Sequence, residues 1–156
     1  MDPLRRLLIR ASTASTASAA LLALGILAPR RVLAADWNRL AFTAGNFNDS
    51  LKAYGAPNSL ENRDIVITAP EISENGAQVP IEISSTLPGN QTFAIFVEKN
   101  PMPLAATLSF SNGALAYTRI QLKMAESSRL RVVVRTSDGK HHHATREIKV
   151  TLGGCG

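Results

Sequence analysis

The sequence predicts an all-β fold: an immunoglobulin-like antiparallel β-sandwich of about seven strands, preceded by a short N-terminal helical segment. Beyond Asn62, apolar residues recur at every second position in successive short segments, as in strands that bury one face. Residues that favour turns separate these segments, and no long helical stretch lies between them. Parallel crossover units are therefore disfavoured, and consecutive antiparallel strands are expected.

The seven expected strands are each marked by two or three alternating apolar side chains. These are Ile65 and Ile67; Val79, Ile81 and Ile83; Phe93, Ile95 and Val97; Leu108 and Phe110; Ile120, Leu122 and Met124; Leu130, Val132 and Val134; and Ile148, Val150 and Leu152. A single cysteine cannot join two sheets by a disulfide, so aliphatic and phenylalanine packing must form the core. The two prolines in residues 100–103 exclude regular ladder pairing there.

Residues 36–54 show a weaker, helical pattern. Its predicted buried stripe consists of Trp37, Leu40, Ala41 and Ala44, which recur three and four residues apart. A second short turn carrying Leu51 and Tyr54 is expected to begin at a cap formed by Asn48 and Asp49. Gly55 should end this turn.

Residues 1–35 have the features of a signal peptide of the twin-arginine type. Two adjacent arginines precede a hydrophobic stretch, and small residues precede a predicted cleavage after Ala34 or Ala35. The strongly apolar core, residues 19–28, is much shorter than the roughly 20 residues of a spanning helix. The sequence therefore predicts cleavage and release into the periplasm, with no membrane anchor.

Removal of this segment changes the charge of the chain. It contains five arginines and one aspartate, so the mature chain would keep 12 of the 17 basic and 11 of the 12 acidic residues, a net charge near +1. The high overall pI therefore reflects the signal segment, and nucleic-acid binding is not predicted. The remaining residues, 36–152 with a tail at 153–156, correspond to one domain with one core.

Residues 153–156 hold the single cysteine of the chain between glycines. Cys155 has no partner for an internal disulfide and no apolar neighbours in sequence that would bury its thiol. Because glycine leaves the backbone free, we expect a flexible C-terminal carrier arm in which Gly153, Gly154 and Gly156 supply movement and access. A displayed thiol on such an arm suits a covalent group carrier, as in lipoamide and coenzyme A.

Basic residues gather on two predicted strands. Arg129, Arg131 and Arg135 are expected on the outward face of one strand, and Arg146 and Lys149 lie on the last. One interpretation is a solvated charged face. The other is an electropositive surface that meets anions or an acidic partner.

Three consecutive histidines follow the predicted turn at Asp138 and Gly139. Alternation places His141 and His143 on one face, but the sequence offers no third metal ligand. We therefore predict no metal and no cofactor, and interpret the histidines as part of a solvated strand face. In a competing hypothesis the chain is a thiol enzyme, and this histidine run supplies the base for Cys155.

Four segments, residues 68–76 (TAPEISENG), 97–104 (VEKNPMPL), 123–126 (KMAE) and 149–156 (KVTLGGCG), carry a family resemblance. Together they resemble the SoxY family, the sulfur-carrier subunits of bacterial thiosulfate oxidation. The resemblance covers essentially all of the chain after the signal segment. One departure is that the family usually ends in Gly-Gly-Cys-Gly-Gly, whereas this sequence has Gly-Gly-Cys-Gly.

The resemblance implies a carrier without catalytic turnover of its own. It implies a heterodimer with a SoxZ-like subunit, itself immunoglobulin-like. It also implies successive visits to a haem-containing thiosulfate-conjugating enzyme, a sulfate-releasing hydrolase and, in many systems, a sulfane dehydrogenase. On this chain, Cys155 would hold the thiosulfate-derived sulfur.

A second competing hypothesis is a periplasmic immunoglobulin-like binding or chaperone-like module, in which the tail thiol is incidental. Terminal residues often tolerate change, and an unpaired thiol can simply oxidise. Deletion of residues 153–156 separates the two functions, because it would leave a binding module working and would inactivate a carrier.

Overall fold

The computed structural model describes residues 37–111 and 113–151. Within these ranges the chain forms two helices and nine strands, and neither helix is long and apolar enough to cross a membrane. The elements are α2 Arg39–Thr43, α3 Phe47–Tyr54, β1 Leu60–Glu61, β2 Ile65–Thr68, β3 Ile72–Ser73, β4 Val79–Ser85, β5 Asn90–Val97, β6 Leu104–Ser109, β7 Tyr117–Leu122, β8 Ser128–Thr136 and β9 His141–Val150.

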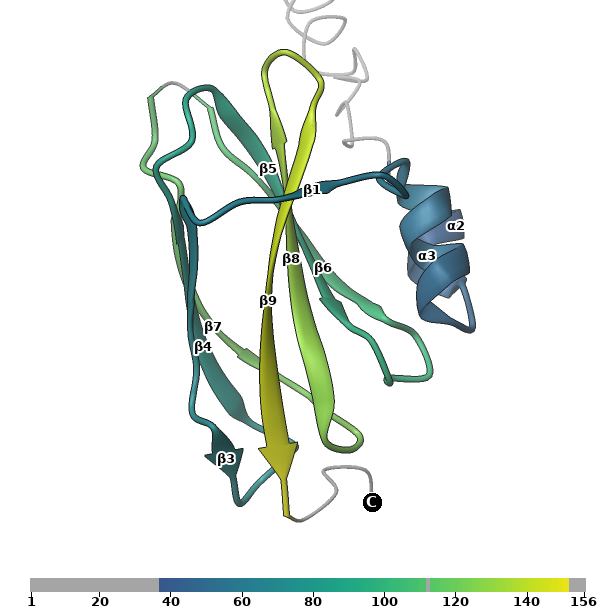
Figure 1. The fold of residues 1–156 in the computed structure, drawn as a ribbon. Coiled ribbons are helices and arrows are strands. Elements are labelled where there is room, and N and C mark those ends of the chain that lie inside the picture. The colour runs from purple at the N-terminus through teal and green to yellow at the C-terminus, as the bar shows by residue number, and fades with distance from the viewer. Residues whose placement is uncertain (1–36, 112, 152–156) are drawn as a thin grey trace, which may run out of the picture. The chain divides into compact units, whose positions relative to one another are not determined.

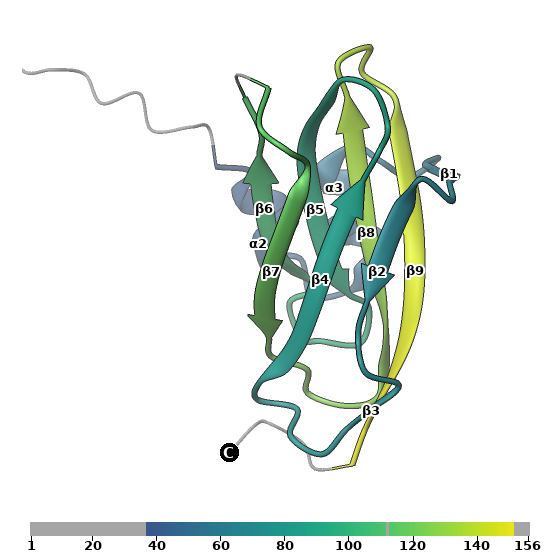
Figure 2. The same cartoon turned by 90° about the vertical axis from the view of Figure 1, so that its left-hand side faces the viewer.

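The strands form two sheets that face each other (Figure 2). The larger sheet has the order β1-β9-β8-β5-β6, with β3 also paired to β9, and the smaller sheet has the order β2-β4-β7. Pairing is antiparallel except at β1 and β3, which both run parallel to β9. The predicted antiparallel sandwich is confirmed, and β1 and β3 are additions to the seven predicted strands.

Alternating side chains of both sheets fill the space between them, as the period-two pattern requires. The buried residues of this core include Val79, Ile81, Ile83, Phe93, Ile95, Val97, Leu130, Val132, Val134 and Ile148. Phe93 meets Phe110 edge to face, with 4.6 Å between ring centroids. The predicted core of aliphatic and phenylalanine side chains is confirmed.

Helices α2 and α3 cover the other face of the larger sheet (Figure 1). The buried apolar cluster between helices and sheet consists of Ala41, Leu51, Ala56, Ala94, Phe96, Leu104 and Val133. Phe96 is fully buried and makes T-shaped contacts with Phe47 and Tyr54, each with 5.8 Å between ring centroids. The larger sheet is therefore covered on both faces in this region.

The predicted stripe on the first helix was largely wrong. Ala41 is buried, but Trp37 is 63% exposed and Leu40 is 75% exposed. The reason is that α2 has five residues, begins after its N-cap Asn38 and ends before Gly45. Such a short helix buries only the small Ala41 side chain fully, with Phe42 partly buried beside it, and it is too short for a stripe two turns long.

The predicted cap of α3 was displaced by two residues. Asn46, not Asn48, is the N-cap, and its Oδ1 accepts a hydrogen bond from the Asp49 backbone N–H at 2.9 Å. The physical signal is an asparagine directly before the first apolar residue, Phe47. The end of the helix was correct: Gly55 adopts φ 91°, a left-handed conformation that glycine accepts without strain.

The interpretation of the basic residues of β8 as a solvated charged face was wrong at Arg131. Its side chain is 17% exposed, and one guanidinium nitrogen lies 3.0 Å from a Glu98 carboxylate oxygen. The Phe47 ring covers this guanidinium, with 5.0 Å between the ring centroid and Cζ. Burial occurs because the helices lie over this face, which a strand pattern alone does not reveal. Arg129 is about half exposed and also pairs with Glu98, at 3.9 Å.

Candidate functional site

The predicted carrier arm, Gly153, Gly154, Cys155 and Gly156, lies outside the described residues, as does the predicted signal segment 1–35. The last described residue is Thr151, which directly follows β9. The structure therefore describes the place to which the predicted arm is attached. We call residues 149–151 the arm base.

Hydrogen bonds hold the arm base on both sides. On the β3 side, Lys149 N–H donates to the Glu71 carbonyl at 2.9 Å and Thr151 N–H donates to the Ser73 carbonyl at 3.1 Å (Figure 1). On the other side, the Val150 N–H donates to Ser127 Oγ at 2.9 Å, and this hydroxyl lies 3.3 Å from the Val150 carbonyl. The backbone of the arm base is thus held by hydrogen bonds up to Thr151.

The segments that carry the family resemblance meet at this end of the sandwich. Met124 N–H donates to the Gly76 carbonyl at 2.7 Å, which joins the segment at 123–126 to the segment at 68–76. The Asn100 side chain donates to the Lys123 carbonyl at 2.8 Å and accepts from Ala125 N–H at 2.9 Å, which adds the proline-containing loop. The loops next to the arm base therefore form one hydrogen-bonded network.

We expect Ser127→Ala to loosen the arm base without unfolding the domain. The substitution removes the acceptor of the Val150 N–H, and one such hydrogen bond contributes about 1 kcal/mol. Amide hydrogen exchange at Val150 should therefore accelerate about fivefold, while exchange at Ile95 in the core stays unchanged. Ser59→Ala is the matched control, because its hydroxyl contacts His143 near the other end of β9. Unchanged exchange at Val150 would show that Ser127 does not hold the arm base.

The structure confirms that His141 and His143 share one face of β9. The His141 ring packs against Tyr54, with 6.0 Å between centroids, and His143 Nδ1 lies 3.0 Å from Ser59 Oγ. Burial lowers the pKa of both histidines, which favours their neutral forms. Among the described residues, no three His, Cys, Asp or Glu side chains gather as metal ligands.

These histidines lie too far from the arm base to act on Cys155. A strand rises about 3.3 Å per residue, so His143 lies roughly 26 Å from Thr151 along β9. Cys155 follows Thr151 by four residues, and four extended residues reach about 14 Å. The geometry therefore disfavours the thiol-enzyme hypothesis in which this histidine run is the base within the same chain.

A shallow cleft lies directly beside the arm base. Its volume is about 320 Å³, and it is lined by Glu71, Ile72, Arg146, Glu147 and Lys149. An Arg146 guanidinium nitrogen lies 3.9 Å from a Glu71 carboxylate oxygen. Ile72 is 58% exposed although β3 fixes its backbone against Lys149. We call this feature the Ile72 cleft.

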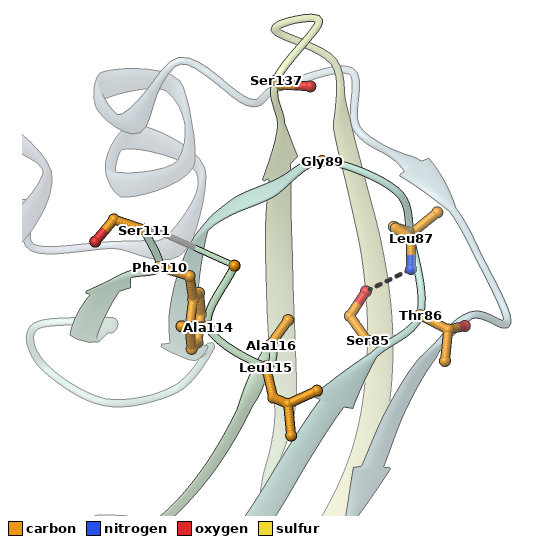
Figure 3. A pocket seen from close by; sticks show the side chains of 11 residues that line it. Ser85, Thr86, Leu87, Gly89, Phe110, Ser111, Ala114, Leu115, Ala116 and Ser137 are labelled. Atoms are coloured by element: carbon orange, nitrogen blue, oxygen red, sulfur yellow. Dashed lines mark hydrogen bonds between the residues drawn. The ribbon is translucent and has the colours of Figure 1, made fainter.

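A larger cleft, about 610 Å³, lies at the opposite end of the sandwich. Figure 3 shows its walls, which come from the loops after β4 and β6 and from Ser137 at the β8–β9 turn. Its lining is uncharged and includes Leu87, Phe110 and Leu115. The segment from Thr151 to Cys155 is too short to span the length of the sandwich, so this cleft is separate from the predicted site.

Comparison with known proteins decides the family. The sequence model of the family described as "Sulfur oxidation protein SoxY" matches residues 51–155, a range that includes Gly153, Gly154 and Cys155. The chain belongs to the SoxY family. A solved structure, the sulfur carrier protein SoxY from Chlorobium limicola f thiosulfatophilum, is similar to it with a TM-score of 0.62 and 34% identity, over 70% of this chain and 96% of that chain.

Other solved structures are more distant from this SoxY-family chain. A superoxide reductase (neelaredoxin) from Ignicoccus hospitalis matches with a TM-score of 0.49 and 20% identity, over 56% of this chain and 80% of its own. A putative superoxide reductase from Thermotoga maritima matches with a TM-score of 0.48 and 15% identity, over 56% of this chain and 86% of its own. These likenesses have no bearing on function. A search of curated proteins found no match.

Two parts of the SoxY-family site were not predicted from the sequence. Ser127 is one of several serines in loops, and no local pattern distinguishes the one whose hydroxyl meets Val150. Ile72 lies in a stretch without alternating apolar residues, so neither its strand nor its exposure was predicted. Both depend on the register between β9 and its neighbours, which the sequence does not display.

Proposed function

We propose that this SoxY-family chain is a periplasmic sulfur carrier that holds thiosulfate-derived intermediates covalently on Cys155. The observation that carries the proposal is the arm base, because its backbone is hydrogen-bonded up to Thr151 and the glycine-flanked thiol follows four residues later. A fixed base followed by a mobile thiol suits a group that several separate enzymes must reach. The chain itself performs no turnover in this scheme.

Loading joins the Cys155 sulfur to the outer sulfur of thiosulfate. The thiol loses its proton, and formation of the sulfur–sulfur bond releases two electrons, which the haem-containing enzyme accepts. In the hydrolase, water attacks the terminal sulfonate sulfur and the bond from this sulfur to its neighbour breaks, so that sulfate leaves, two protons are released and a persulfide anion remains on Cys155. A sulfane dehydrogenase, where the system has one, would oxidise this remaining sulfur for a second hydrolysis.

In this proposal the receiving enzyme, and not the carrier, activates the thiol. The thiolate is the reactive form, and an ordinary cysteine with a pKa of about 8.5 is only slightly ionised at neutral pH. His141, the first residue of the histidine run, starts β9 at the end away from the arm base. A poorly ionised thiol on the free carrier is less exposed to side oxidation, and cationic groups or a metal in an enzyme can ionise it after docking.

Membership of the SoxY family implies a partnership with SoxZ. We propose a heterodimer that folds before export through the twin-arginine route. Strands β6 and β7 end their sheets on one side, and unpaired edge strands need cover. A second sandwich subunit can supply that cover.

The swinging-arm proposal is tested by Gly154→Val. A β-branched residue restricts the backbone and widens the arm, so we expect delivery to the haem-containing enzyme to slow by tenfold or more, on the order of 1.4 kcal/mol. Alkylation of Cys155 by a small maleimide should stay at the wild-type rate. Gly45→Val, between the two helices, is the control for a general effect of valine, because Gly45 has no positive φ and an added side chain there meets open space. If alkylation and delivery fall together, the substitution has altered the thiol itself, and the arm proposal is wrong.

A further inference from the structure

We propose that the Ile72 cleft is the surface on which the sulfur-processing enzymes dock while Cys155 enters their active sites. This inference rests on the proposed carrier function and adds the contact surface that such a carrier needs. The occupant is the rim of an enzyme's active-site entrance, with an apolar side chain for Ile72 and charged groups of both signs around it.

The first argument is reach. Cys155 follows the anchored Thr151 by four residues, and a fully extended segment of that length spans about 14 Å. An enzyme that acts on the sulfur must therefore bring its reacting centre within this distance of Thr151. Because an active site lies below the protein surface, the rim around it must then touch the end of the sandwich that holds the arm base.

The second argument is the form of the surface at that end. Ile72 is directly in register with Lys149 of the arm base, and more than half of its side chain is exposed. Its backbone is fixed by β3, so little conformational entropy is lost when a partner covers it. Residues that dominate protein interfaces are commonly apolar, fixed in place and surrounded by polar groups that exclude water.

The third argument is charge. The cleft has two acidic residues, Glu71 and Glu147, and two basic residues, Arg146 and Lys149, so its formal charge is zero. A resting place for an anionic sulfur adduct would be expected to carry an excess of positive charge. A balanced rim instead fits a protein surface that presents charges of both signs, and it fixes orientation more than it adds affinity.

The test uses the mature chain with its partner subunit and compares Ile72→Ser with Val66→Ser. Val66 is also β-branched and 52% exposed, but it lies on β2. We expect Ile72→Ser to raise KM of the haem-containing enzyme for the carrier about tenfold, because an apolar contact is lost on docking, with kcat unchanged. Val66→Ser should leave KM within twofold of wild type. Alkylation of Cys155 by a small maleimide and the thermal midpoint should be the same in all three proteins.

Several results would overturn the inference. An unchanged KM for Ile72→Ser, or an equal rise for Val66→Ser, would show that docking does not use this cleft. A changed alkylation rate would show that the arm itself occupies the cleft, and a changed oligomeric state in gel filtration would indicate a second copy. If Ile72→Ser lowers the thermal midpoint, Ile72→Thr keeps a β-branched strand residue and gives the same comparison. These results are distinguishable from a failure of the proposed carrier function, because in that case sulfur would still be loaded onto the Cys155→Ser chain.

Discussion

A chain with Cys155→Ser should fold, pair with its partner and support no thiosulfate-dependent turnover above background. A hydroxyl cannot form the sulfur–sulfur bond on which the proposed cycle depends. The residue comes four positions after Thr151, the last described residue, and we expect the domain to tolerate the change, so the thermal midpoint should be unchanged. Turnover is measured with the complete set of purified enzymes and thiosulfate.

Ser127→Cys is a useful companion to Cys155→Ser. It places a thiol beside the arm base, within the hydrogen-bonded structure and not on the glycine segment. In the double variant, a thiol is present but cannot swing, so turnover should stay at background. Recovery of turnover in the double variant, or persistent turnover in Cys155→Ser alone, would contradict a carrier role for Cys155.

Phe96→Ala should lower the free energy of unfolding by about 3–5 kcal/mol, the usual effect of truncating a buried phenylalanine. Phe96 is fully buried between the larger sheet and the helices, where its ring contacts Phe47 and Tyr54. The loss should appear as a lower midpoint in denaturant unfolding. Maleimide alkylation of Cys155 in the native state should not change, because the arm base does not contact this cluster.

Tyr117→Ala is the matched control for Phe96→Ala. Tyr117 is an aromatic residue on β7 that is 51% exposed, so its truncation should cost much less stability. Equal losses in the two variants would mean that the helices contribute little to the stability of the sheet they cover.

The sandwich was predictable because its core strands follow local rules. Residues such as Ile81, Ile83 and Ile95 alternate with polar or outward positions, and glycine-containing turns at Gly89 and Gly139 have positive φ as expected. The two missed strands, β1 and β3, have two residues each and pair in parallel with β9. Pairs so short are determined by long-range placement, so the residues themselves show no period.

The sequence contains a sign of the helical layer that a search for alternating apolar residues does not detect. In β5 every residue from Thr92 to Val97 is buried, and in β8 so are Val132, Val133 and Val134. A continuous apolar run indicates a strand covered on both faces. Ala94, Phe96 and Val133 are the residues that face the helices, and this same cover explains why Arg131 is partly buried and paired instead of solvated.

The thiol of the candidate site followed from composition, whereas its setting did not. One cysteine between glycines predicts Cys155 as the carrier residue without any structure. The groups that hold the arm base belong to Glu71, Ser73 and Ser127, which come from two separate parts of the chain. Two of these groups are backbone carbonyls, which carry no residue-specific signal, so only the observed register brings them to the arm base.

The most direct test of the account is intact-mass analysis of the protein taken from the periplasm of cells that are oxidising thiosulfate. We predict that a fraction of the wild-type chain lacks residues 1–35 or 1–34 and carries added sulfur, that a thiol reductant removes the added mass, and that Cys155→Ser never acquires it. An unmodified mass in cells that are actively oxidising thiosulfate, or the same added mass on Cys155→Ser, would contradict the central claim.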